Sequence, residues 1–268
     1  MNTAYNMDCL QGLKNIDTGS IDLTVTSPPY DDIRTYTGYV FQWRDIIREL
    51  YRVTADGGVV VWIVADQTRD GSESGSSFEQ TLFAKECGFN LHDTMIWEKD
   101  SCSFPDASRY YQIFEFMFVW SKGRPKTFNP IEDRPNLWGG CNVHGTFRNR
   151  DGTMRNRSET WKSTICKENG RRFNVWKIPS EKNNKTGHPA VFPLSLAQDH
   201  IRTWSNERDV ILDPFLGSGT TRIAAYDMNR QFIGFEISKE YFAKQEERFK
   251  KHTAQRSMFN EECEEETT

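Results

Sequence analysis

Short apolar runs and amphipathic segments follow one another along most of this 268-residue chain. The apolar runs are rich in β-branched and aromatic residues, which indicates buried strands. We place these strands at residues 21–25, 59–64, 89–97, 113–120, 210–213 and 232–236. Segments with apolar residues at helical spacing lie at residues 42–53, 78–87, 194–204, 222–228 and 239–250, and the Gly- and Ser-rich residues 71–77 predict a flexible loop. Strands that alternate with helices predict an α/β fold with a doubly wound, mostly parallel sheet.

The strand predicted at 21–25 leads into the sequence Thr26-Ser27-Pro28-Pro29-Tyr30. Two consecutive prolines restrict the backbone and hold a rigid turn at the carboxyl end of the strand. Open α/β sheets bind their ligands at that end. The Ser27 hydroxyl and the Pro28 carbonyl offer two acceptors for an exocyclic amine, and Tyr30 offers a ring on which a base can stack. Taken alone, the same sequence also fits a surface turn or a polyproline ligand for a partner domain.

A second candidate site begins where the strand at 210–213 ends in Asp213. The following residues, Pro-Phe-Leu-Gly-Ser-Gly-Thr-Thr, place Gly217 and Gly219 in a turn before a helix, and glycine lets a ligand approach the backbone closely. The next strand ends in Glu236, where an acid holds the ribose in dinucleotide-binding folds. The glycine pattern is too short for a dinucleotide fingerprint, and Asp213 would repel a diphosphate. The pattern therefore predicts a nucleoside ligand without phosphates.

Together these two motifs resemble those of the β group of S-adenosylmethionine-dependent DNA amino-methyltransferases. Thr-Ser-Pro-Pro-Tyr is similar to the catalytic motif of that family, and Asp-Pro-Phe-Leu-Gly-Ser-Gly-Thr-Thr is similar to its cofactor motif. The resemblance covers most of residues 1–250, with the catalytic half ahead of the cofactor half. It implies a Rossmann-like class I methyltransferase fold with circularly permuted motifs and S-adenosylmethionine as cofactor. The expected parts are a catalytic half at 1–121, an inserted target-recognition region at 122–186, a cofactor-binding half at 187–252 and an acidic tail at 253–268.

The resemblance also implies roles for individual residues. The catalytic residues would be Ser27, Pro28, Pro29 and Tyr30. The cofactor would contact Asp8, Asp213, Phe215, Gly217, Gly219, Thr220 and Glu236. Residues 187–193 are similar to the segment that closes over the methionine end of the cofactor. Two departures are Met7, where many members have glycine, and residues 190–192, where Ala-Val-Phe replaces the frequent Thr-Gln-Lys.

Further polar residues near these motifs have two interpretations each. The residues that would complete the base pocket are Asp31, Asp32, Arg34 and Tyr36, although either aspartate also suits a helix cap. His188 would be a catalytic base, although its place before Pro189 suits a turn.

Charge is distributed unevenly along the chain, whose net charge is −4. Residues 122–186 contain fifteen Lys and Arg against six Asp and Glu, a net charge of +9, so the remainder carries −13. The aromatic residues of this basic segment are Trp138, Phe147, Trp161, Phe173 and Trp176. Basic groups mixed with amides and aromatic rings are typical of a module that reads duplex DNA, and a solvated charged face is the alternative. We expect DNA contacts from Arg148, Arg150, Arg155 and Arg157.

The six cysteines are scattered without a CxxC pair, which suits a reducing compartment. Cys141, His144 and Cys166 lack a fourth ligand at metal-binding spacing, so no metal is predicted. No apolar run is long enough for a membrane span and no signal-peptide pattern is present, so we expect a cytoplasmic protein. The acidic residues 261–268 are expected to be disordered.

The expected reaction is methyl transfer from S-adenosylmethionine to the exocyclic amine of a base flipped out of duplex DNA. Two acceptors that hold both amine hydrogens would free the nitrogen lone pair for attack on the methyl group. In the family that this chain resembles, serine at the start of the catalytic motif is commonly linked to cytosine N4, so N4-methylcytosine is predicted and N6-methyladenine is the alternative. A cognate restriction endonuclease acting separately is the other expected partner. The motif order and the basic insert disfavour an RNA or protein amino-methyltransferase, and the intact Ser27 and glycines disfavour a non-catalytic DNA-binding relative.

Overall fold

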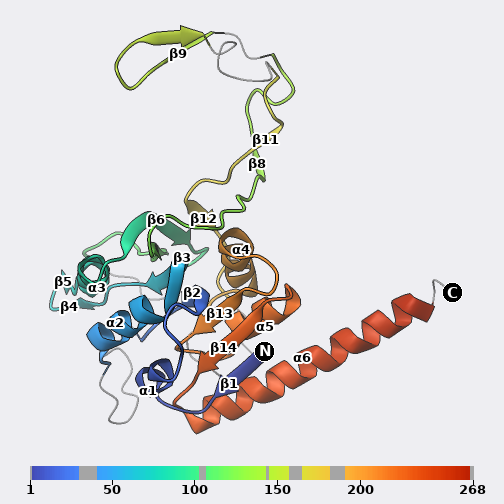
Figure 1. Cartoon of the computed structure of the whole chain (residues 1–268). Helices are drawn as coiled ribbons and strands as arrows, with labels where there is room; N and C mark the ends of the chain where they lie inside the picture. The colour runs from blue at the N-terminus through green and yellow to red at the C-terminus, as the bar shows by residue number, and fades with distance from the viewer. Residues whose placement is uncertain are drawn as a thin grey trace. The chain divides into compact units, whose positions relative to one another are not determined.

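The fold is described from a computed structural model of the chain (Figure 1). The structure describes residues 2–29, 41–102, 107–142, 145–156, 165–181 and 191–265. Within these residues, one sheet has eight strands in the order β1–β14–β13–β2–β3–β7–β6–β12. Their bounds in that order are Asn2–Tyr5, Gln231–Phe235, Val210–Asp213, Ile21–Thr26, Thr54–Val64, Phe114–Ser121, Asn90–Glu98 and Val175–Lys177. Only β7 pairs antiparallel with its neighbours, so all the other strands of this sheet point the same way.

Helices cover both faces of this sheet. Their bounds are α1 (Cys9–Lys14), α2 (Trp43–Val53), α3 (Ser76–Glu86), α4 (Leu194–Trp204), α5 (Thr220–Asp227) and α6 (Lys239–Glu265). α2 packs against α1 and α3, whereas α5 packs against α4 and α6. Figure 1 shows α2 and α3 on one side of the sheet and α4 and α5 on the other. The predicted α/β fold with a doubly wound, mostly parallel sheet is therefore confirmed.

Apolar side chains fix the layers to one another. Ile46, Ile47 and Leu50 form the apolar stripe of α2 and are fully buried in the core. Trp62 of β3 stacks on Trp120 of β7, with 5.2 Å between the ring centroids. Burial of one such large side chain contributes about 1.5–3 kcal/mol. β3 in turn pairs with β2, and this ladder fixes the strand from which the Ser-Pro-Pro turn emerges.

The start of α3 differs from the sequence prediction. The helix begins at Ser76, inside the predicted loop 71–77, because the Asp66 carboxylate accepts a hydrogen bond from Ser77 N over 2.9 Å. The buried face of α3 is polar, and Trp62 Nε1 donates to Gln80 Oε1 over 2.8 Å. Apolar periodicity is therefore a poor guide to where this helix begins. The short antiparallel pair β4 (Thr68–Arg69) and β5 (Ser72–Glu73) precedes it.

Both ends of the chain also differ from the prediction. The sequence pattern does not predict β1 or α1, which are short and lack a clear apolar period. α6 continues to Glu265, so the expectation of disorder is wrong for residues 261–265. Residues 251–265 contain no proline or glycine, and their Glu, Lys, Gln and Ala content favours helix continuation.

Residues Pro130–Asn174 form a second compact unit, inserted in the sequence of the main unit. Its described residues contain two short antiparallel ladders and one isolated antiparallel bridge, between Asn142 and Ile165. One pairs β8 (Arg134–Pro135) with β11 (Asn169–Gly170), and the other pairs β9 (Thr146–Arg148) with β10 (Met154–Asn156). We call Pro130–Asn174 the inserted unit.

The inserted unit is shorter than the predicted target-recognition region at 122–186. Residues 122–129 and 175–181 belong to the main unit. β12 extends the main sheet beside β6, and its Trp176 is buried, with its ring stacked 4.5 Å from that of His200. Trp176 is therefore a core residue and not an exposed ring for DNA bases.

Candidate active site

Four neighbouring parallel strands carry predicted site residues at one edge of the main sheet. β2 leads to Ser27, β13 ends in Asp213, β14 is followed by Glu236, and β1 is followed by Asp8. The chain passes from β2 to β3 on one side and from β13 to β14 on the other, so β2 and β13 flank a topological switch point. The two sequence motifs thus meet where open α/β sheets bind ligands.

One hydrogen bond joins the two motifs directly. Thr26 Oγ1, at the end of β2, donates to Asp213 Oδ1 over 2.7 Å. The same oxygen accepts from Phe215 N over 3.1 Å, and Asp213 is 1 % exposed. Burial raises the pKa of Asp213 to about 6, and hydrogen bonds from Thr26, Thr221 and Phe215 oppose the rise. Asp213 therefore ties the catalytic strand to the glycine-rich loop, and its contact with a cofactor stays a prediction.

Glu236 holds the same loop from the next strand. Its Oε2 accepts from Gly217 N over 2.9 Å, and its Oε1 accepts from Ser238 N over 2.8 Å. Burial raises the pKa of Glu236, the two backbone hydrogen bonds lower it, and the negative charge of Asp213 adds to the rise. Gly217 and Gly219 have φ values of +51° and +80°, a region that favours glycine. The glycines are thus required by the shape of the loop itself.

α6 supports the loop from behind. Arg248 Nη1 donates to Ser218 O over 2.8 Å and to Thr220 Oγ1 over 3.2 Å. A Cβ atom on Gly219 would lie 3.2 Å from Gln245 Cβ, so the helix packs closely on the loop. Thr220, a predicted cofactor contact, is buried and bonded within the protein. Sequence reasoning missed Arg248 and Gln245, and their spacing of three on one helix face is the signal that points to them.

The residues after β1 complete this edge of the sheet. Asp8 is the N-cap of α1 and accepts from Gln11 N over 3.1 Å, and its contact with the cofactor stays a prediction. Asn6 Nδ2 donates to the Glu236 carbonyl over 2.8 Å and joins the ends of β1 and β14. Sequence reasoning missed Asn6, because only the tertiary pairing of these two strands reveals its role.

The catalytic turn continues from β2 as irregular backbone. Ser27 and Pro29 are half-buried, and Pro28 is buried. Phe215 of the glycine-rich loop packs edge-to-face on Trp62 of the core, with 6.3 Å between ring centroids. The predicted residues that lie outside the described part of the chain are Tyr30, Asp31, Asp32, Arg34, Tyr36, His144, Arg157, Trp161 and, in the predicted closing segment, residues 187–190, which include His188.

The β9–β10 ladder and its turn carry three of the four arginines predicted to contact DNA. The register pairs Arg148 with Met154 and Phe147 with Arg155. Directly opposite residues share a face and consecutive residues alternate, so Arg148 and Arg155 lie on opposite faces of the ladder. Arg150 lies in the connecting turn, and all three arginines are exposed.

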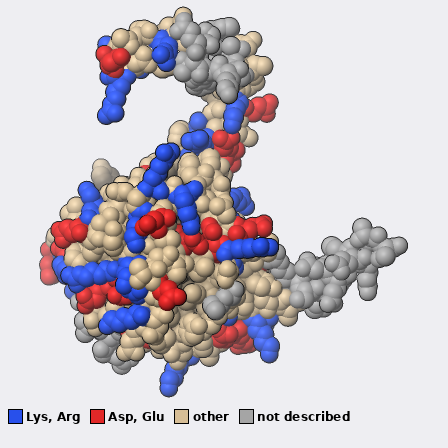
Figure 2. All heavy atoms as spheres, in the orientation of Figure 1, with Lys and Arg blue, Asp and Glu red and all other residues tan. Residues whose placement is uncertain are grey.

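Two other basic residues of the inserted unit are paired with acids. Lys167 Nζ lies 2.8 Å from Glu132 Oε2, and Arg172 forms an ion pair with Asp133. On the face of the main unit seen in Figure 2, Lys and Arg side chains lie among Asp and Glu side chains. The arginines of the β9–β10 ladder are thus the stronger candidates for phosphate contacts.

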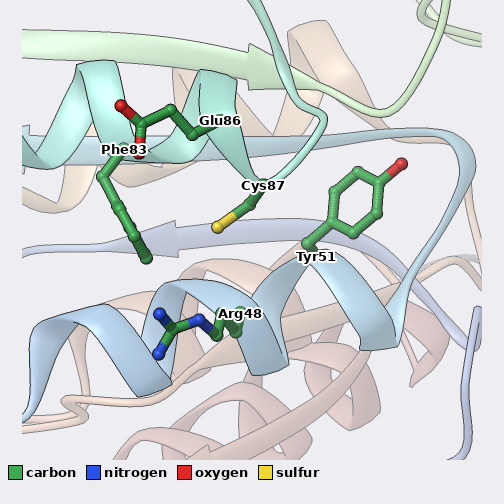
Figure 3. A pocket seen from close by; sticks show the side chains of 5 residues that line it. All are labelled: Arg48, Tyr51, Phe83, Glu86 and Cys87. Carbon is green, nitrogen blue, oxygen red and sulfur yellow. The ribbon is translucent and has the colours of Figure 1, made fainter.

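A pocket between α2 and α3 contains none of the predicted site residues (Figure 3). Its lining residues are Arg48, Tyr51, Phe83, Glu86 and Cys87. The Arg48 guanidinium lies 5.0 Å from the centre of the Phe83 ring, and burial raises the pKa of the Cys87 thiol. None of the lining residues belongs to the strand ends where the two motifs meet.

The described residues form neither a metal-binding cluster nor a membrane-spanning helix. No group of three or more His, Cys, Asp and Glu side chains in that part of the chain is arranged to hold a metal ion. No helix there combines the length and the apolar character needed to cross a membrane.

Comparisons with known proteins agree on one family. The family model for N6/N4 methyltransferases, described as DNA methylase, matches residues 21–247. The orphan methyltransferase M.BamHII of Bacillus amyloliquefaciens is 55% identical over 247 residues, which cover 89% of this chain and 92% of that protein. The PvuII DNA methyltransferase, described as cytosine-N4-specific, has a TM-score of 0.68 at 21% identity and covers 92% of this chain and 86% of its own. The M1.HpyAVI–SAM complex has a TM-score of 0.65 at 23% identity, and the match covers 93% of this chain and 99% of that chain.

Proposed function

We propose that this chain, which belongs to the N6/N4 DNA methylase family and has the Rossmann-like class I methyltransferase fold, transfers a methyl group from S-adenosylmethionine to cytosine N4 in duplex DNA. The observation that carries the proposal is the Thr26–Asp213 hydrogen bond. It joins the turn predicted to hold the base to the loop predicted to hold the cofactor. Methyl transfer needs two reactants in one fixed geometry, and a direct bond between their loops supplies that constraint.

S-adenosylmethionine suits the acidic edge of the sheet. It is a nucleoside without phosphates, and its sulfonium and ammonium groups are cations. Burial disfavours the ionised forms of Asp213 and Glu236 and so raises the pKa of both. A nearby cation would offset this cost and stabilise the two carboxylates. Each Glu236 oxygen accepts one backbone N–H and has a second acceptor position that suits a ribose hydroxyl. When bound, this cofactor supplies a methyl group on an electrophilic sulfonium.

The protein would activate the amine by positioning it. The Ser27 hydroxyl and the Pro28 carbonyl would each accept one amine hydrogen, which frees the nitrogen lone pair for attack. The base must first leave the duplex, because pairing occupies its amine, and Tyr30 would stack on the flipped ring. No covalent bond between protein and base is needed in this scheme.

Cytosine N4 is proposed as the target because Ser27 begins the catalytic motif. The family also contains adenine-N6 enzymes. Both bases present an amine beside a ring nitrogen, so the hydrogen bonds alone do not separate them. Cytosine is the smaller ring and lets the pocket close further around its amine. Adenine N6 is the second candidate.

The β9–β10 ladder is proposed as the DNA-contacting element. A two-stranded β ribbon fits the major groove of B-DNA. Arg148 and Arg155 on opposite faces, with Arg150 at the turn, suit a ribbon that lies between two phosphate backbones. The cytoplasm, with DNA and cofactor present, is the proposed compartment, and a separate cognate restriction endonuclease is a proposed partner.

Mass spectrometry of nucleosides tests the target base. DNA from a host without its own methyltransferases would be analysed after expression of the wild-type chain. The proposal predicts N4-methylcytosine as the product. N6-methyladenine as the sole modified nucleoside would contradict the base assignment, and the absence of any methylated nucleoside in DNA would contradict the proposed function.

A further inference from the structure

Two cysteines of the inserted unit lie directly opposite each other. Cys166 N donates to the Cys141 carbonyl over 2.9 Å, and Asn142 forms an antiparallel bridge with Ile165, the next pair in the same register. The Cys166 carbonyl accepts from Gly140 N over 2.9 Å, whereas Cys141 N donates to the Trp138 carbonyl, so Gly140 and Cys141 together form a bulge opposite Cys166. Both cysteines are free thiols, with Cys141 exposed and Cys166 half-buried.

This register suits a covalent link between the two side chains. Residues that face each other across an antiparallel pair of strands have Cα atoms about 4.5 to 5.5 Å apart. Disulfides span Cα separations of about 4.4 to 6.8 Å. Directly opposite side chains also project from the same face of a ladder. A disulfide between Cys141 and Cys166 then requires that the local backbone bring their Cβ atoms to about 3.5 to 4.5 Å.

We propose that Cys141 and Cys166 are a modification site that forms a reversible disulfide with a low-molecular-weight disulfide such as oxidised glutathione. The Cys141 thiolate attacks one sulfur of that disulfide, forms a mixed disulfide and releases one thiolate. The Cys166 thiolate then attacks Cys141 Sγ, forms the intramolecular bond and releases the second thiolate. The protein loses two electrons and two thiol protons, and the small disulfide is reduced to two thiols.

The position of this bond gives it a consequence for the inserted unit. It would close the loop 142–165, which contains β9, β10 and the exposed Arg148, Arg150 and Arg155. A closed loop has fewer conformations to lose when it binds a partner. If these arginines contact DNA, as the proposed function holds, oxidation should tighten duplex binding. In a reducing compartment the thiols stay free at rest, so the bond would respond to oxidising conditions.

The full-length protein would be treated with oxidised glutathione and then digested without reductant for peptide mass spectrometry. We expect one cross-linked peptide pair containing Cys141 and Cys166, the loss of two hydrogens from the intact mass, and reversal by dithiothreitol. Cys166→Ser should abolish the link, whereas Cys87→Ser and Cys102→Ser, at half-buried free cysteines of the main unit, should leave it unchanged. Stable glutathione adducts without the internal link, or a link between other cysteines, would overturn the proposal.

Duplex affinity separates this proposal from the function on which its consequence rests. The oxidised protein should bind duplex DNA severalfold more tightly than the reduced protein, and Cys166→Ser should remove the difference. Equal affinity with the disulfide fully formed would overturn the link to DNA binding. Absence of duplex binding in both redox states would contradict the proposed function, while the mapped disulfide would still stand.

Discussion

The edge of the main sheet and the β9–β10 ladder are built in contrasting ways. At the sheet edge, Thr26 and Asp213 are almost fully buried and bonded to each other, and Glu236 is bonded to the loop beside them. On the ladder, Arg148 and Arg155 are exposed. Methyl transfer requires atoms fixed before the reaction, whereas phosphate contacts form only when DNA arrives. The contrast supports the proposal that chemistry and DNA contact belong to separate units of one chain.

The two regions also differ in what holds them together. β2 and β13 lie inside an eight-stranded sheet with helices on both faces. β9 and β10 form a two-stranded ladder of three residue pairs, and such a ladder is marginally stable alone in water. The sheet edge should therefore keep its geometry without ligand, and the ladder should depend more on its partner.

The largest expected effect comes from matched glycine substitutions in the two regions. Gly217 and Gly152 both have positive φ, at +51° and +88°, so valine strains the backbone at either position. Gly217→Val should weaken S-adenosylmethionine binding roughly 100-fold or more, because strain and a β-branched side chain both disturb the loop that Glu236 holds. Gly152→Val should leave cofactor affinity unchanged and reduce duplex binding. Calorimetry measures the cofactor affinity and the duplex affinity of each variant, and circular dichroism checks that each variant folds. Equal cofactor affinity in the two variants would contradict the proposal that the sheet edge binds the cofactor and the ladder binds DNA.

A smaller effect is expected from the pH dependence of stability. The pKa of Asp213 is raised from 3.8 to about 6 in the folded chain, so between these two pH values the folded state binds a proton that the unfolded state has lost. Stability should therefore fall as pH rises towards and through 6, and should be lowest where buried Asp213 is ionised. Asp213→Asn removes this charge and keeps an oxygen that can accept from Thr26 and Phe215.

Denaturant unfolding at pH 5 and pH 8 measures this difference. Relative to Asp213→Asn, the wild type should lose about 1 kcal/mol between the two conditions. Asp56→Asn, at a residue with a 98% exposed side chain, controls for the loss of one negative charge. Wild-type and Asp213→Asn profiles that run parallel would show that burial of this carboxylate does not govern the pH response.

The smallest expected effect concerns the ladder. Arg148 and Arg155 would be replaced together by Gln. If both contact phosphate, the slope of the logarithm of the duplex-binding constant against the logarithm of salt concentration should become less steep by up to about two. Arg172→Gln is the matched control, because Arg172 lies in the same unit and pairs with Asp133. Fluorescence anisotropy at several salt concentrations gives the slopes. The same slope for the double variant and the wild type would show that other residues contact the phosphates.

Much of the fold can be predicted from the sequence because its local patterns agree with its tertiary structure. The apolar runs that become β2, β3 and β13 mark buried parallel strands, and Asp213 and Glu236 stand where those patterns end. α3 is harder to place because its buried face is polar. β12 is a short strand at the end of the insert, and only its pairing with β6 places it in the main sheet.

The supporting bonds of the site lie beyond sequence patterns for a related reason. Thr26 and Asp213 are 187 positions apart, and Arg248 reaches Ser218 from a helix 30 positions later. Neither pair has a local signature, because each depends on how the strands and α6 pack. The motifs thus predict which residues meet a ligand, and the structure adds the residues that hold those motifs in place.

Single-turnover methyl transfer by Ser27→Ala tests the central claim, that the turn after β2 activates the amine at a site whose cofactor is held by the adjacent loop. Ser20→Ala is the control, because the Ser20 hydroxyl donates to the Asp17 carbonyl at the other end of the same strand. We predict that Ser27→Ala raises the barrier by about 2 kcal/mol, roughly a 30-fold loss of rate, while cofactor affinity stays at the wild-type value. Wild-type turnover in Ser27→Ala, or a loss explained entirely by weaker cofactor binding, would contradict the account.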